Sequence, residues 1–264
     1  MPRIGAGLIV WAMNSDPRPI GAAAHRVEYF EEIDSTNLEA RRRAEAGEEG
    51  QLWICAARQS AGKGRRGRGW ETGEGNLAAT FLFFTDKPPA QAAQISFVAA
   101  LAVAELADAF VPPVLVTLKW PNDTLVGAKK AAGILVESGA ARARGCLWVA
   151  VGMGVNLARA PLAADRPATA FAEHMRRPPP TPKEALAVLT AAFDRWRGVW
   201  EEAGFAAIAR AWTKRAHGLG TPCVAQLSAE TVRGVAEGLD PDGALRLRTA
   251  AGEVRKITAG DVFF

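Results

Sequence analysis

The chain has 264 residues, of which 49% are hydrophobic and 23% are charged, and its formal net charge is +4. This composition is typical of a soluble globular protein with one large domain, or with one large and one small domain. The small positive excess permits an anionic ligand and does not require nucleic acid. Three separated cysteines without a CxxC pair do not indicate a disulfide framework, so we expect a reducing, cytoplasmic location.

Residues 1–24 are expected to form a poorly ordered N-terminal extension. Apolar residues at 4–13 give this segment a faint likeness to a signal peptide, but charged residues and prolines at 16–19 interrupt the pattern. A second apolar stretch at 95–110 contains two acidic residues and is too short to span a bilayer. We therefore expect no membrane partner.

The next part of the chain, residues 25–217, mixes strand and helix patterns. Apolar runs and alternation predict strands at 25–33, 52–57, 77–84, 114–118, 133–137 and 147–155. Helical spacing and capping residues predict helices that begin after Asp34 and Ser35, and others at 90–110, 183–203 and 205–212. Two segments are expected to be irregular, the glycine-rich residues 59–76 and the proline- and alanine-rich residues 161–182.

Residues 218–264 have a different texture, with short apolar alternations at 232–235 and 245–247. A Pro-Asp-Gly sequence at 241–243 lies between them and predicts a turn. This spacing predicts a small all-β, barrel-like domain.

The loop at 58–70 reads RQSAGKGRRGRGW and carries five positive charges with no acid until Glu71. Its glycines allow sharp turns and a close approach of backbone N–H groups to a ligand. Its arginines offer forked donors that match carboxylate and phosphate oxygens. The combination indicates a loop that closes over an anion.

Other interpretations of this loop must be weighed. The glycines satisfy GxGxxG, but no apolar helix follows, as a Rossmann turn requires. A Walker A loop is excluded because Lys63 is followed by Gly64 and not by Ser or Thr. A nucleic-acid-binding Arg/Gly segment and a merely solvated basic loop both remain open at this point.

A second polar segment, KWPND at 119–123, follows the strand predicted at 114–118. Binding residues collect at strand ends in α/β sheets, and a carboxylate such as Asp123 suits Mg²⁺ beside a polyphosphate. The alternative is an ordinary type I turn. Lys130 opens the next apolar strand, either as a surface residue or as an anion ligand.

Taken together, these segments resemble the signature segments of biotin protein ligases. The matching segments are DSTN at 34–37, GKGRRGRGW at 62–70, KWPND at 119–123, KKAAGILVE at 129–137 and GMGVNL at 152–157. The resemblance covers roughly residues 25–264. It implies an α+β fold, in which residues 25–217 form a catalytic domain with a mixed sheet packed with helices. Residues 218–264 would then form a C-terminal SH3-like β-barrel.

The resemblance also implies a two-step reaction with biotin and ATP as substrates and Mg²⁺ as cofactor. Biotin's carboxylate attacks the α-phosphate of ATP and forms biotinyl-5'-adenylate, and a lysine of a biotin carboxyl-carrier domain then displaces AMP. The expected carrier belongs to acetyl-CoA carboxylase and related carboxylases. Some relatives bind DNA through an N-terminal winged helix-turn-helix, for which residues 1–24 are too short. We therefore expect no DNA partner, and a monomer or homodimer.

The resemblance implies that one set of residues holds biotin and closes the loop over it. These residues are Ser35, Thr36, Asn37, Gln59, Gly62 and Gly64, while Trp70, Gly133 and Gly152 are implied more generally among the residues that bind the two small molecules. A plain helix N-cap is the alternative role for Ser35.

A second set is implied for the carboxylate and the nucleotide. The residues implied to meet the carboxylate and α-phosphate are Lys63, Arg65 and Lys130. Arg66 and Arg68 would order the loop or hold the outer phosphates, and Asn156 would contact the nucleotide. The Mg²⁺ and carrier side is assigned to Asp123, with Lys119 and Asn122 near it. The residues expected to carry the chemistry are thus Arg65, Lys130, Asp123 and Lys119. The family often has Arg where this chain has Lys63, which keeps the charge and loses the fork.

Two rival functions remain at this point. A lipoate or octanoate protein ligase shares the fold that the resemblance implies, but would lack the paired glycine-basic and KWPND segments. A nucleic-acid-binding module would use the Arg/Gly loop and would bind with steep salt dependence.

Overall fold

The computed structural model describes residues 9–10, 25–141, 145–161 and 167–264. Our expectation for residues 1–24 therefore lies outside the described residues, apart from a short strand, β1 (Ile9–Val10), paired with β2. Part of the irregular stretch predicted at 161–182 lies outside them as well.

The larger sheet has eight strands in the order β1-β2-β3-β4-β8-β7-β6-β5. Only β2 and β3 pair in parallel, and the other neighbours are antiparallel. The mixed sheet confirms the expected α+β class. The strands after β1 are β2 (Arg26–Ile33), β3 (Leu52–Gln59), β4 (Leu77–Thr85), β5 (Val116–Lys119), β6 (Asp123–Val126), β7 (Lys129–Ala141) and β8 (Cys146–Val155).

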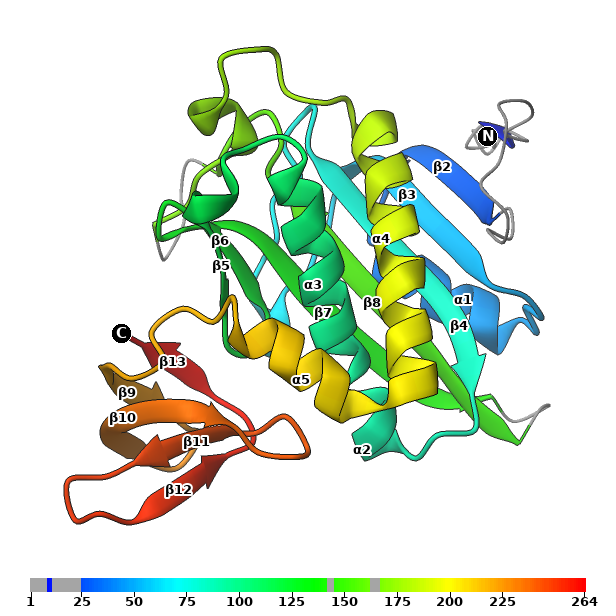
Figure 1. The fold of residues 1–264 in the computed structure, drawn as a ribbon. Helices are drawn as coiled ribbons and strands as arrows, with labels where there is room; N and C mark the ends of the chain where they lie inside the picture. The colour runs from blue at the N-terminus through cyan, green and yellow to red at the C-terminus, as the bar shows by residue number, and fades with distance from the viewer. Residues whose placement is uncertain (1–8, 11–24, 142–144, 162–166) are drawn as a thin grey trace.

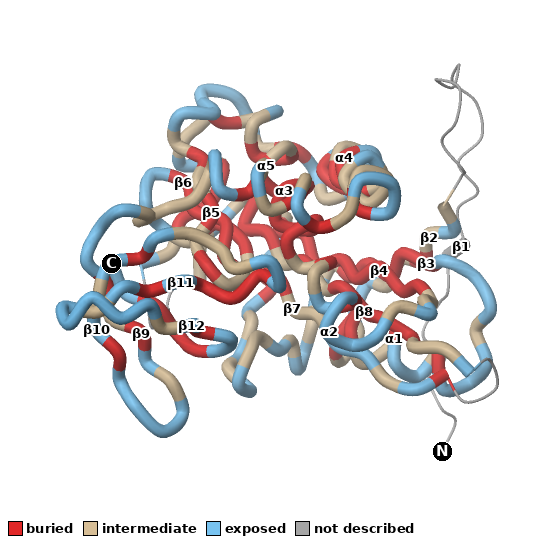
Figure 2. Tube along the Cα trace, turned by 60° about the horizontal axis from the view of Figure 1, so that its bottom comes forward, coloured by how far each residue is buried: buried red, intermediate tan, exposed pale blue. Residues whose placement is uncertain are grey.

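Helices cover both faces of this sheet (Figure 1). One face packs against α3 (Ile95–Asp108) and α4 (Pro182–Ala203), α5 (Phe205–Thr213) packs on these two helices, and the main apolar core fills the interface. The other face packs against α1 (Thr36–Glu45) through a smaller cluster that includes Ala40, Ile54 and Ala150. Figure 2 shows the buried segments gathered in the sheet and in α3. The strands are hydrophobic for this reason, since helices remove both faces from water.

The last part of the chain forms a five-stranded antiparallel sheet with the order β12-β11-β10-β9-β13. This sheet confirms the predicted small β domain, while closure into a barrel stays a prediction. Its strands are β9 (Pro222–Gln226), β10 (Thr231–Leu239), β11 (Leu245–Arg248), β12 (Val254–Ile257) and β13 (Asp261–Phe263). The predicted Pro-Asp-Gly turn joins β10 to β11, and Gly243 has the positive φ of +92° that such turns favour.

Two predicted elements were wrong in detail. Residues 90–110 form a short helix, α2 (Pro89–Ala92), followed by α3, and not one continuous helix. Among the described residues, the helical stretch Pro89–Asp108 is long and apolar enough to cross a membrane, but 67% of its apolar window is buried. Its apolar residues are explained by burial in the core, because α3 packs on the sheet and on α4.

The second error concerns residues 119–126. Asn122 lies in the turn directly after β5, as expected, but Asp123 opens β6, which pairs antiparallel with β5. The argument from carboxyl ends of parallel strands therefore does not apply here. Four-residue strands in a tight hairpin lack the length that makes an apolar pattern visible.

Candidate active site

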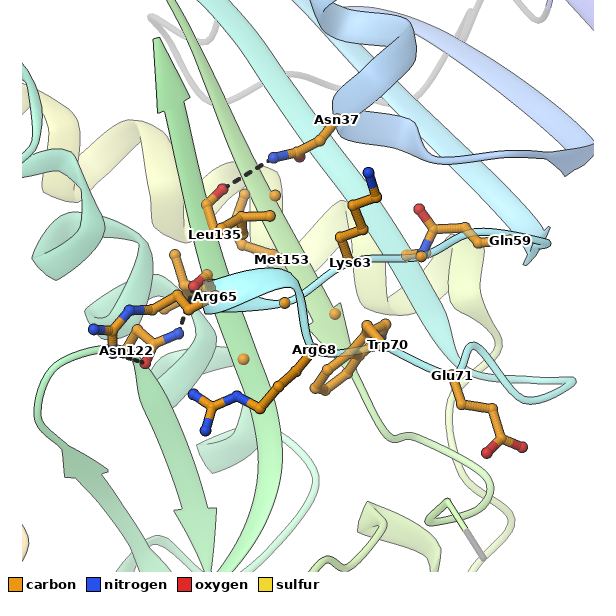
Figure 3. A pocket seen from close by; sticks show the side chains of 18 of the residues that line it. Asn37, Gln59, Lys63, Arg65, Arg68, Trp70, Glu71, Asn122, Leu135 and Met153 are labelled. Atoms are coloured by element: carbon orange, nitrogen blue, oxygen red, sulfur yellow. Dashed lines mark hydrogen bonds between the residues drawn. The ribbon is translucent and has the colours of Figure 1, made fainter. Parts of the chain in front are cut away.

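A cavity of about 790 Å³ lies where the basic loop crosses the larger sheet. Most of the predicted site residues line it: Ser35, Thr36, Asn37, Gln59, Gly62, Lys63, Gly64, Arg65, Arg68, Trp70, Asn122, Asp123, Lys130, Gly133, Gly152 and Asn156. Figure 3 shows Arg65 beside Asn122 on one side of the loop and Asn37 and Gln59 on the other. Segments that are distant in sequence thus converge on one site.

The start of α1 supplies a hydrogen-bonded polar corner. Gln59 Oε1 accepts from the Thr36 backbone N–H at 2.8 Å and from its hydroxyl at 3.1 Å. Asn37 Nδ2 donates to Glu137 Oε2 at 2.7 Å, and the Thr80 hydroxyl donates to Asn37 Oδ1 at 2.7 Å. Because each side chain is held by another, the corner offers donors and acceptors in fixed directions.

Ser35 occupies the N-cap position of α1, but its side chain makes no capping hydrogen bond. Ser35 is therefore the N-cap residue by position, but it lacks the side-chain hydrogen bond that a capping role implies. The side chain of Gln59 instead accepts from Thr36 N–H at this helix end. The nearly buried Ser35 hydroxyl remains in the cavity wall.

The basic loop folds back on itself. Trp70 N–H donates to Gly62 O at 2.9 Å, and Gly64 N–H donates to Arg68 O at 2.7 Å. A Cβ atom at Gly62 would lie 2.4 Å from Trp70 O, so this closure requires glycine. Arg66, with φ of +59°, takes the sharp turn. No apolar helix follows the loop, which agrees with the exclusion of a Rossmann turn.

Arg65 contacts two other segments of the chain from the middle of the basic loop. Arg65 donates to Asn122 Oδ1 and to Gly260 O, both at 3.2 Å. Burial lowers the pKa of the Arg65 guanidinium, while the carboxylates of Asp261 and Asp123 act in the opposite direction. An arginine remains charged in spite of such a shift. The loop thus presents permanent positive charge to a partly enclosed cavity.

The hairpin of β6 and β7 contributes an ion pair. Lys130 Nζ lies 2.6 Å from Asp123 Oδ1, and Asp123 is only 7% exposed. The register shifts so that Ala131 has no partner in β6. Lys130 and Gly133 would otherwise alternate to opposite faces, and this bulge brings the ammonium group within 3.2 Å of a Cβ placed at Gly133.

Trp70 packs against the sheet at two glycines. A Cβ atom at Gly154 would be 2.3 Å from the indole ring, and one at Gly133 would be 3.1 Å from it. Lys130 Nζ lies 5.5 Å from the ring centroid. The glycines of the 129–137 and 152–157 segments therefore make room for the indole that ends the basic loop.

Two predicted residues do not line the cavity. Lys119 instead places its ammonium group 5.8 Å from the Phe263 ring centroid and 6.0 Å from that of Phe264. Arg66 pairs with Asp261 at 3.3 Å. Their assigned roles stay predictions.

Sequence reasoning missed other lining residues. Asp261 at the start of β13 lines the cavity although it follows the basic loop by more than 190 residues. Trp120 lines it too, and its indole N–H donates to Gly243 O at 3.0 Å. Thr80 and Glu137 support the polar corner. Trp120 lies inside KWPND and Glu137 ends the KKAAGILVE segment, but no local pattern marks Asp261 or Thr80.

The acidic residues at the site fit a metal ion that arrives with a ligand better than a resident one. Within the described part of the chain, no three His, Cys, Asp or Glu residues gather as a metal site. Asp123 and Asp261 both line the cavity, but each is already paired with a cation. Mg²⁺ commonly takes one or two carboxylates and completes its shell with substrate phosphates and water.

Comparisons with known proteins agree with this geometry. Residues 29–156 match the biotin/lipoate A/B protein ligase family, and residues 218–264 match the biotin protein ligase C-terminal domain. A biotin–[acetyl-CoA-carboxylase] ligase of Paracoccus denitrificans is 43% identical over 88% of this chain and 97% of its own length. One from Mycobacterium tuberculosis is 30% identical over 92% and 90% of the two chains.

Among solved structures, the fold is similar to the biotin protein ligase from Aquifex aeolicus in complex with biotin and ATP. The TM-score is 0.73 at 24% identity, over 90% of this chain and 97% of that one. At this identity the likeness supports the fold, whereas the family follows from the sequence relatives. The chain belongs to the biotin protein ligase family.

Proposed function

We propose that this enzyme uses ATP to join biotin to a lysine of the carrier domain of acetyl-CoA carboxylase, through biotinyl-5'-adenylate. The observation that carries the proposal is the single cavity that combines two surfaces. One is the fixed polar corner of Thr36, Asn37 and Gln59, and the other is the cationic wall that includes Arg65 and Lys130.

The polar corner suits the uncharged, hydrogen-bonding end of biotin. Thr36 and Asn37 are nearly buried, and their partners hold them in place before a ligand arrives. A cyclic urea presents both N–H donors and a carbonyl acceptor, which amide and hydroxyl groups match. We assign Ser35, Gly62, Gly64, Gly133 and Gly152 to the same pocket.

The cationic wall suits the first chemical step, in which a carboxylate oxygen attacks the α-phosphorus of ATP and pyrophosphate leaves. Two anions must approach one another, and preorganised positive charge reduces their repulsion. Arg65, Lys130, Lys63 and Arg68 all line the cavity, so this positive charge is in place before the substrates bind. Asn156, whose amide donates to Thr169 O at 3.1 Å, is assigned to the nucleotide.

Mg²⁺ is proposed as the cofactor of this step, and Asp123 with Asn122 would hold it on the phosphate side. When bound, it would neutralise phosphate charge. Asp123 also orients Lys130 through their 2.6 Å ion pair. In the second step, the carrier lysine attacks the acyl carbon of the adenylate, and AMP leaves with the bond electrons. No covalent enzyme intermediate is required.

Further parts of the proposal concern organisation. We propose a catalytic domain over residues 25–217, a C-terminal domain over 218–264 and a cytoplasmic location. The free cysteines Cys55, Cys146 and Cys223 suit a reducing compartment. Lys119 and Arg66, which lie outside the cavity wall, are proposed to act on the carrier side and in loop order respectively.

The test is transfer of radiolabelled biotin to a purified carrier domain in the presence of ATP and Mg²⁺. We expect one biotin per carrier and none when the carrier's acceptor lysine is replaced by arginine. Lipoate and octanoate serve as competing substrates, and transfer of either in preference to biotin would favour the rival ligase. Tight binding of RNA or DNA with steep salt dependence would favour the nucleic-acid module.

A further inference from the structure

The C-terminal domain places an acidic side chain in the wall of the cavity. Asp261 begins β13 and is only 7% exposed. Its two carboxylate oxygens accept from both terminal nitrogens of Arg68, at 2.9 and 3.0 Å. Arg66 donates to the same carboxylate at 3.3 Å, and the neighbouring Gly260 carbonyl accepts from Arg65. Three arginines of the basic loop therefore meet two consecutive residues of the other domain.

An acid at this position needs a physical reason. The proposed ligands are a carboxylate and a polyphosphate, and a nearly buried negative charge repels both. The Asp261 carboxylate is compatible with the reaction if it holds the arginine side chains where they contact the anionic ligands. Arg68 and Arg66 have side chains that are 39% and 43% exposed, and a long exposed arginine samples many rotamers. A forked pair with Asp261 selects one of them.

The anchor is itself held. Asp261 pairs with Gln226 in the β13–β9 ladder, and the C-terminal domain docks on the KWPND segment through Trp120 and Gly243. Phe97 and Phe205 pack edge to face, with ring centroids 5.2 Å apart, where Gly243 approaches them. Asp261 thus has a fixed position relative to the larger sheet, and it can hold the middle of the basic loop, where Arg66 and Arg68 are otherwise largely exposed.

We propose that Asp261 is a positioning residue for adenylation, which acts through Arg68. It holds the Arg68 guanidinium at the cavity wall and fastens the basic loop, so that the loop stays closed over biotinyl-adenylate until the carrier arrives. The proposal rests on the proposed function. It assigns to the C-terminal domain a direct part in retaining the intermediate.

A double-mutant cycle tests the connection between the two residues. The proteins are wild type, Asp261→Asn, Arg68→Ala and the double variant, each purified as the full chain. The first readout is the escape of adenylate, measured as biotin label on albumin with biotin and ATP but no carrier. The second is the KM for ATP beside the KM for biotin, and the third is the thermal midpoint.

We expect Asp261→Asn to raise albumin labelling by about ten- to a hundredfold, the effect of losing one charge-assisted hydrogen bond. The KM for ATP should rise, while the KM for biotin changes by less than about twofold because the polar corner is untouched. The double variant should leak no more than Arg68→Ala alone, since Asp261 works through that arginine. Asp261→Glu should restore part of the retention.

The matched control is Glu230→Gln, which removes an exposed ion pair with Arg255 in the same small domain. It should leave labelling and both KM values unchanged. If the two effects add in the double variant, Asp261 does not act through Arg68 and the proposal fails. If Asp261→Asn lowers only the thermal midpoint, Asp261 has a folding role alone, and the proposal fails as well. Tighter ATP binding by Asp261→Asn would also overturn it, because the acid would then be inhibitory.

Two further measurements keep the outcome decisive. Arg68→Lys leaves the C-terminal domain intact, keeps the charge and loses the fork, so it should also leak if the forked pair matters. Hydrogen exchange of the amides at 62–70, without ligands, should be faster in Asp261→Asn and Arg68→Ala alike, and no faster in the double variant. Failure of wild type to form any adenylate would instead overturn the proposed function, and the exchange data would still report on the contact.

Discussion

Lys130 Nζ lies 2.6 Å from Asp123 Oδ1, and this ion pair joins two adjacent strands of the larger sheet at the cavity wall. The partners are buried to different degrees, with side chains 28% and 9% exposed. We propose two roles for Asp123: it orients the ammonium group of Lys130, and it lies on the phosphate side of the site, where it would hold Mg²⁺.

Asp123→Asn should impair adenylation much more than biotin binding. Asparagine keeps the shape but loses the charge that holds Lys130 and would hold Mg²⁺. We expect pyrophosphate release to slow by about ten- to a hundredfold, as for the loss of one preorganised electrostatic group. Pyrophosphate release across a Mg²⁺ titration checks this, beside calorimetric biotin binding. The control is Asp86→Asn, which changes an exposed aspartate. Normal rates with normal Mg²⁺ dependence in Asp123→Asn would show that Asp123 does not hold the metal ion.

Arg65→Gly should weaken retention of biotinyl-adenylate more than its formation. Arg65 contacts Asn122 and Gly260 from the middle of the loop, so its guanidinium is placed to close on a phosphate. Charge-assisted hydrogen bonds contribute roughly 1.5–3 kcal/mol each, so escape should rise by about ten- to a hundredfold. Albumin biotinylation measures the escape. Arg58→Ala, an exposed strand residue paired with Glu32, should not label albumin more than wild type.

The basic loop and KWPND were predictable because their chemistry is local. Glycines between arginines, and an acid beside an asparagine, indicate an anion site wherever they lie in a fold. The position of Lys130 was also predicted, although the reason for its direction, the bulge at Ala131, was not. A bulge depends on how two strands pair, which the strand's own residues do not reveal.

The contacts of Asp261 and Trp120 could not be predicted from the local sequence. Asp261 meets Arg68 across 193 positions of sequence, and Trp120 meets Gly243 across 123. Such contacts depend on how the small domain docks, and a single sequence does not encode the docking in any periodic pattern. Likewise, β6 has only four residues, and its polar first residue favoured the interpretation as a turn.

Gly152→Ala should weaken biotin binding without unfolding the protein. A methyl group there would lie 2.3 Å from Asn37 Oδ1, so Asn37 would have to leave its contacts with Thr80 and Glu137. Overpacking of this kind costs about 1–3 kcal/mol, which predicts roughly a five- to hundredfold higher dissociation constant. Titration calorimetry with biotin measures it. Unchanged affinity would show that the Asn37 amide does not contribute to the pocket.

Gly198→Ala is the matched glycine change and should have the opposite sign. Gly198 lies inside α4, and nothing lies within 4 Å of a Cβ placed there. Alanine should raise the free energy of unfolding by about 0.5–1 kcal/mol, because glycine loses more backbone entropy in a helix. Denaturant titration measures the gain, and biotin affinity should stay at the wild-type value. A loss of stability would mean that α4 needs glycine for a reason that its surroundings do not show.

The three cysteines should differ sharply in reactivity toward a thiol reagent. Cys55 is fully buried on β3, and burial raises the pKa of its thiol. Burial also raises the pKa of the Cys223 thiol, whereas Cys146 at the start of β8 is partly exposed. The thiolate is the reactive form, so a raised pKa and restricted access both slow the reaction. At pH 8, we expect one fast-reacting thiol in the native protein and three in denaturant. Cys146→Ser should abolish the fast phase, and a fast phase that survives this substitution would mean that β3 or β9 opens on the timescale of the assay.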